Sequence, residues 1–66
     1  MWTVVYIAQN RIAAEQIKSV LEIEGIMAML RPIGVPHLGD SGAVEVLVTQ
    51  LEAEEAVEII TGSFNR

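Results

Sequence analysis

The fold is decided by residues 10–26, NRIAAEQIKSVLEIEGI. Asn10 can cap the start of a helix, because its side chain can accept a hydrogen bond from a backbone amide of the first turn. Gly25 can end that helix, because glycine readily adopts the left-handed conformation that often follows a last turn. The stretch therefore predicts an amphipathic helix with one face toward a core. Its apolar stripe is Ala13, Ala14, Ile17, Val20 and Leu21.

Three segments rich in β-branched and aromatic residues predict strands around this helix. Strict alternation in the last segment is expected to turn Val44, Val46 and Val48 toward the helices. The first segment is apolar on both faces, with Trp2, Val4 and Tyr6 in one row. The sequence leaves open which of its rows meets the helices. The three segments are residues 2–8, residues 26–31 and residues 43–49.

A second helix is predicted from about residue 50 to Thr61. Thr49 and Glu52 have the spacing of a capping box at its start, and Gly62 is expected to mark its end. The helical repeat predicts one apolar stripe that packs inward. Its members are Ala53, Ala56, Val57 and Ile60.

The order strand, helix, strand, strand, helix predicts a single α+β domain over residues 1–66. The first two strands are joined by a helical crossover, so they should be parallel. The third strand can lie between them and antiparallel to both, as in the split β-α-β unit of ferredoxin-like folds. We therefore expect a truncated ferredoxin-like β-α-β-β-α domain, with a three-stranded antiparallel sheet and both helices on one face.

Helices on one face would leave the other face of the sheet uncovered. Residues 2–8 would also form a bare edge, and bare edges and apolar faces are usually buried against another chain. With no cysteine, disulfides cannot stabilise so small a domain, which leaves oligomerisation. These features predict a homo-oligomer, either a dimer or a trimer, that associates through the uncovered face, the edge at residues 2–8, or both. The candidate interface residues are Trp2, Val4, Tyr6, Met27, Met29 and Leu47.

Composition argues against several classes of function. A net charge of −5 with scattered basic residues is untypical of a nucleic-acid-binding protein. Apolar runs fall well short of the about 20 residues of a membrane span, and no secretory signal begins the chain, so we expect a cytoplasmic protein without a membrane partner. One histidine and no cysteine favour the absence of a metal or cofactor. No nucleophile with a nearby base is visible, so we expect no enzymatic activity.

Residues 33–42 form the longest irregular segment, and such loops often carry function. His37 and Asp40 fit either a ligand, metal or pH-sensitive site or a polar turn capped by the aspartate. The glycines fit either a close approach to phosphate or simple turn geometry. The candidate partner or ligand residues of the loop are Gly34, His37, Gly39, Asp40 and Gly42.

The charged residues Arg31 and Glu45 lie on neighbouring predicted strands. They fit a cross-strand ion pair that stabilises the sheet. Alternatively, Glu45 is a polar anchor in a subunit interface or ligand pocket. Both interpretations place the two residues on the face of the sheet that the helices do not cover.

Two groups of residues, one in each half of the chain, carry a resemblance. They are Ala14-Glu15, Leu21-Glu22 and Glu24-Gly25-Ile26, then Val44-Glu45-Val46-Leu47-Val48 and Ala53-Glu54-Glu55-Ala56. These residues resemble the small bacterial family of prokaryotic signal-transducing proteins. That family is similar to the PII-type nitrogen regulators, which share a ferredoxin-like core and are trimers that bind adenine nucleotides between subunits. No nucleotide-binding residue can be matched to a position in this chain.

The resemblance implies a PII-like shape and a role in signal transduction. We expect a non-enzymatic regulatory or protein-interaction module that acts as a homo-oligomer on an unknown protein partner. The alternative is a small-molecule sensor that binds an effector, a nucleotide or an amino acid, at a subunit interface.

Overall fold

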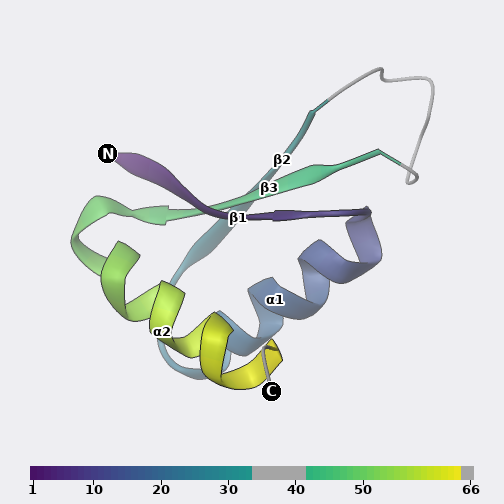
Figure 1. Ribbon diagram of the computed structural model, residues 1–66. Helices are drawn as coiled ribbons and strands as arrows, with labels where there is room; N and C mark the ends of the chain where they lie inside the picture. Colours follow the sequence, from purple (N-terminus) through teal and green to yellow (C-terminus); the bar gives the residue numbers. More distant parts are fainter. Residues whose placement is uncertain (34–41, 65–66) are drawn as a thin grey trace.

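A computed structural model of the chain describes residues 1–33 and 42–64 (Figure 1). Three strands and two α-helices follow one another in the predicted order, and a single 3-10 turn precedes the second helix. The elements are β1 (Trp2–Ala8), α1 (Arg11–Ile23), β2 (Ala28–Pro32), β3 (Val44–Thr49), η2 (Gln50–Glu52) and α2 (Ala53–Phe64).

The strands form one sheet in the order β1-β3-β2, with β3 antiparallel to both neighbours. The strands β1 and β2 are therefore parallel to each other, as a helical crossover requires. Both helices lie on the same face of this sheet (Figure 1). The arrangement confirms the predicted α+β class and is compatible with a truncated ferredoxin-like fold.

Hydrogen bonds at both ends of α1 explain why it begins and ends where it does. The side-chain Oδ1 of Asn10 accepts from the backbone N–H of Ala13 at 2.8 Å. At the other end Gly25 has a φ of 89°, in the left-handed region. The backbone N–H of Gly25 donates to the carbonyl of Glu22 at 3.0 Å, and that of Ile26 donates to Leu21 at 2.9 Å. This pair of bonds is a Schellman motif, so both predicted helix signals are confirmed.

Replacing Asn10 by alanine is expected to lower the free energy of unfolding by about 1 kcal/mol, because the N–H of Ala13 loses its acceptor. Urea denaturation followed by circular dichroism measures the change. Asn10→Asp is the matched control, since its carboxylate can accept the same bond and should keep most of the stability. An alanine variant as stable as the wild type would contradict the role of this cap.

The core lies between the sheet and the helices. The inward row of β3 is buried as predicted. In the predicted stripe of α1, Ala14, Ile17 and Leu21 are buried, whereas Ala13 and Val20 are only partly buried. In α2 the buried stripe is centred on Ala56, so Val57, one position and 100° further round, is 45% exposed. Ile59 packs against the core from the other side of the stripe, and the inward placement predicted for Val57 is wrong. The core cluster is Ala8, Ala14, Ile17, Leu21, Ile26, Ala28, Val44, Val46, Val48, Ala56 and Ile60.

Both predicted boundaries of the second helix need correction. Thr49 Oγ1 donates to Glu52 Oε1 at 3.0 Å and makes no bond to a backbone amide of the turn, so the capping box does not form. The turn Gln50–Glu52 is a 3-10 helix, and α2 begins only at Ala53. At the other end the helix continues through Gly62, whose φ is not positive. Glycine permits a left-handed end but does not require one, so Gly62 alone could not end the helix.

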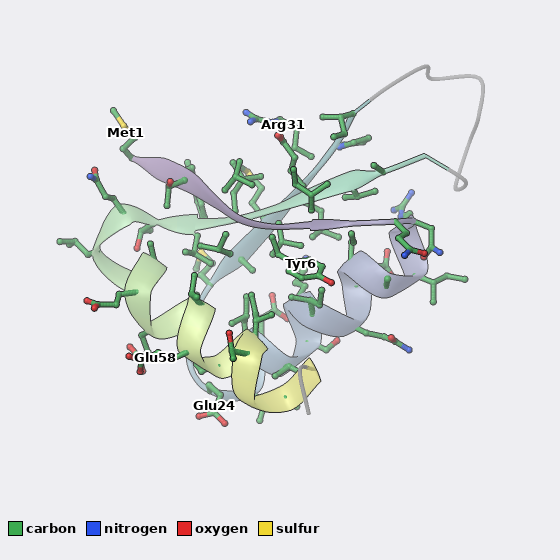
Figure 2. All side chains as sticks on the ribbon, in the orientation of Figure 1. Met1, Tyr6, Glu24, Arg31 and Glu58 are labelled. Carbon is green, nitrogen blue, oxygen red and sulfur yellow. The ribbon has the colours of Figure 1, made fainter. Side chains whose placement is uncertain are left out.

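A β-bulge in β1 changes which side chains share a face. Val4 lies opposite Leu47, whereas Tyr6 lies opposite Val46, so Val5 is an additional residue on the β1 side. Because residues directly opposite each other point to the same face, Val4 and Tyr6 lie on different faces. Figure 2 shows Tyr6 on the helix side of the sheet. The expectation that Trp2, Val4 and Tyr6 form one row is therefore wrong for Tyr6.

Candidate functional site

The candidate site is the face of the sheet that carries no helix, here called the open face. The register places three rows of side chains on it, one for each outward residue of β3. The middle row is apolar throughout, and the row that contains Glu45 carries the charges. The open face consists of Trp2 and Thr49, then Val4, Leu47 and Met29, then Ile7, Glu45 and Arg31.

Leu47 is the centre of the open face. It is 2% exposed, although it does not belong to the core cluster on the helix side. Its direct neighbours are Val4 on β1 and Met29 on β2, which flank it from both sides. The two flanking side chains are themselves each 38% exposed. An apolar centre with half-exposed apolar flanks is the pattern of a surface that excludes water once a partner covers it.

Trp2 and Ile7 extend this apolar surface along β1. Both are exposed. Trp2 lies on the same face as Val4 by simple alternation, and Ile7 lies there because the bulge adds one residue between Val4 and Ile7. The sequence prediction misses Ile7, since a strand apolar on both faces carries no signal for the position of an extra residue. Single exposed apolar residues are ordinary, whereas four around one buried leucine form a patch.

Met27 is a predicted interface residue that lies outside the sheet. It was expected inside the second strand, but β2 begins at Ala28. The reason is the Schellman motif, which uses the backbone N–H of Ile26 to finish α1 and delays the strand. Met27 is exposed beside the first residue of β2.

The charged row of the open face contains one ion pair. Arg31 Nε donates to Glu45 Oε1 at 2.7 Å, as the cross-strand interpretation predicts. The two residues are direct partners in the register, and Figure 2 shows Arg31 on the side of the sheet away from the helices. The Glu45 side chain is only 16% exposed, so its carboxylate is largely shielded from water. The guanidinium of Arg31 compensates this poorly solvated charge.

The remaining described charges lie with the helices and their flanking turns. Arg11 and Lys18 form ion pairs with Glu15 at 3.0 Å and Glu22 at 4.0 Å. Seven acids against these two bases give the helix layer a side-chain charge of −5, whereas one acid and one base leave the open face neutral. Figure 2 shows Glu24 and Glu58 on the opposite side of the molecule from Arg31. The seven acids are Glu15, Glu22, Glu24, Glu52, Glu54, Glu55 and Glu58.

The predicted loop site falls mostly outside the described residues. Gly34, His37, Gly39 and Asp40 are not among them, and Gly42 is. The backbone N–H of Ile33 donates to the carbonyl of Ala43 at 3.0 Å. A Cβ at Gly42 would lie 3.4 Å from the carbonyl oxygen of Ile33, a close but tolerable approach.

A small hollow lies on the helix side of the sheet. It has a volume of about 140 Å³ and is lined by Arg11, Leu30, Pro32 and Val44. Sites for small molecules typically measure about 300–1,000 Å³. This hollow is therefore too small to enclose a nucleotide within one chain.

Comparisons of the chain with protein-family models, with curated proteins and with solved structures find no match. The resemblance to prokaryotic signal-transducing proteins therefore stays a prediction. Neither helix in the described part of the chain combines the length and the apolar character that crossing a bilayer requires. Over residues 1–33 and 42–64, no three His, Cys, Asp or Glu side chains are grouped to hold a metal ion.

Proposed function

We propose that this chain is a non-enzymatic regulatory and protein-interaction module of signal transduction that acts as a homo-oligomer. The observation that carries the proposal is the open face, where exposed apolar side chains surround the buried Leu47. A contiguous apolar patch on a small domain is typical of a protein interaction site. The regulatory role draws its support from the resemblance to prokaryotic signal-transducing proteins.

Size supports the oligomer independently. A domain of 66 residues buries only about 60% of the surface of its unfolded chain, which leaves little stability from one core. The chain has no cysteine, so it cannot gain stability from a disulfide. Covering the open face would add a second apolar layer on the other side of the sheet and stabilise the folded state by mass action.

A native mass spectrum of the protein, purified from its own host and sprayed at micromolar concentration, tests this proposal. A dimer or trimer without added mass is the expected result. A monomer would contradict the homo-oligomer. An oligomer that carries additional mass would instead favour the alternative function, a sensor with a small molecule at its subunit interface, and that mass would give the class of ligand.

The loop provides a test of partner binding. If residues 33–42 contact the protein partner, deleting residues 37–41 should abolish binding and leave the oligomer intact. Partners captured by the full chain are compared with those captured by the deletion variant, with native mass spectrometry as the control for assembly. Undiminished capture by the deletion variant would assign partner binding to another surface.

A further inference from the structure

We infer that the open face is covered by a second copy of this chain, packed face to face as a twofold dimer. The inference deepens the proposed function and rests on it, because it names the partner of the same surface. It also specifies which of the sheet's free surfaces the two copies use, and how they are oriented.

Two copies of this acidic chain repel each other least when they meet through the open face. The chain has a net charge of −5, so two copies repel each other through most of their surfaces. The open face is the neutral exception, and it points away from the acidic helix layer. In a face-to-face dimer the two helix layers lie on the outside, separated by both sheets and hence by more than the Debye length of about 8–10 Å.

The edges of the sheet are less suited to joining two copies. The bulge at Val5 interrupts the regular row of backbone groups on β1, and bulges are a common protection of edge strands. On the other edge, β2 carries Arg31 and ends at Pro32, which has no N–H to donate. Pairing through the face needs no backbone hydrogen bonds, so neither feature opposes it.

A stable dimer would have to bury a substantial part of the surface of each chain. Such an interface typically buries about 800 Å² of each partner. The accessible surface of one chain is 4619 Å², so about a sixth of it would be buried.

The position of Glu45 determines the direction of the twofold axis. An axis parallel to the strands would place β3 on its own copy and bring the two Glu45 carboxylates together. An axis across the strands, through the row of Val4, Leu47 and Met29, instead places the charged row over the row of Trp2 and Thr49. It brings Val4 near the Val4 of the other copy and sets Ile7 on Trp2, so apolar groups meet apolar groups. We therefore assign the axis across the strands, within the roughly 30° that packed sheets normally rotate.

The decisive experiment introduces charge at Val4. In Val4→Glu two carboxylates meet at the axis, and the dissociation constant of the dimer should rise by roughly a hundredfold or more. Ile12→Glu is the matched control, because Ile12 is an exposed aliphatic residue on α1 and far from the axis. Sedimentation equilibrium measures both variants, and circular dichroism checks that they fold.

A charge swap tests the orientation. Val4→Lys alone should also be monomeric, whereas a mixture of the Val4→Glu and Val4→Lys chains, one labelled with ¹⁵N, should form a mixed dimer in native mass spectra. If Val4→Glu mixed with Met29→Lys pairs instead, the axis lies along the strands and the assigned orientation is wrong.

A conservative variant keeps the test valid if a charge at position 4 prevents folding. The chain has no cysteine, so Val4→Cys introduces a single thiol. A short bismaleimide should link two such chains into a covalent dimer and leave Ile12→Cys largely unlinked.

Three results would overturn the inference, and they separate it from the proposed function. A monomeric wild type contradicts both. An oligomer that Val4→Glu and Ile12→Glu leave equally intact excludes the open face and keeps the homo-oligomer. A trimeric wild type likewise excludes the twofold dimer alone.

Discussion

Replacing Leu21 by alanine is expected to lower the free energy of unfolding by about 2–5 kcal/mol. The side chain is fully buried in the core cluster, so the truncation removes apolar contact and leaves a cavity. The total stability of small domains is often only about 5 kcal/mol. A loss at the upper end of this range would leave the variant substantially unfolded at room temperature, and a loss at the lower end would still remove a large share of its stability.

Urea denaturation at fixed protein concentration, followed by far-ultraviolet circular dichroism, measures this loss. Ile23→Ala is the matched control, since Ile23 lies two residues further along the same helix and is 83% exposed. Its stability should stay within about 0.5 kcal/mol of the wild type. Equal effects at the two positions would contradict the inward face assigned to α1.

Replacing Gly25 by alanine is expected to destabilise the protein by about 1–2 kcal/mol, the cost of a left-handed conformation for a residue with a Cβ. The φ of Gly25 is 89°, and an added Cβ would meet no atom within 4 Å. The loss would therefore come from the backbone alone. The strained conformation would weaken the two hydrogen bonds of the Schellman motif, which end α1 just before the chain enters β2.

Gly62→Ala provides the opposite case with the same chemical change. Gly62 lies inside α2 with no positive φ, and an added Cβ there would also meet no atom within 4 Å. Alanine should stabilise the protein by about 0.5–1 kcal/mol, because glycine loses more backbone entropy in a helix. Thermal or urea denaturation of the two variants should thus give shifts of opposite sign. Shifts of the same sign would contradict one of the two backbone conformations.

The sequence predicts α1 and the order of the strands because their signals are strong and local. Asn10 and Gly25 each satisfy backbone groups within four residues of themselves, so no tertiary contact is needed to recognise them. The central place of β3 is the economical arrangement for a strand that follows β2 and runs antiparallel to both of its neighbours. The same reasoning predicts that one face of the sheet carries no helix. It places Leu47, Met29 and the pair of Arg31 and Glu45 on that face.

The bulge in β1 could not be predicted in this way. A strand with one apolar and one polar face shows a break in alternation where a residue is inserted, but both faces of β1 are apolar. Tyr6 therefore faces the helices and Ile7 lies on the open face, the reverse of simple alternation. Nothing in the sequence pattern indicates this change. The predicted helix end at Gly62 and the predicted inward position of Val57 are wrong for a related reason. The end and the rotational phase of α2 depend on how the helix packs against the sheet.

The central position of β3 has a consequence for the order in which the protein folds as it is synthesised. The strands β1 and β2 hydrogen-bond only to β3, which is the last of the three to leave the ribosome. Until then α1 can form from its own capping signals, whereas both apolar strands lack a partner. The pairing of Trp2 with Thr49 then joins two residues that lie 47 positions apart in one slow, non-local step. A nascent chain halted before Val44 has left the ribosome can hold α1 but no sheet, and it is in this interval that it is most exposed to aggregation.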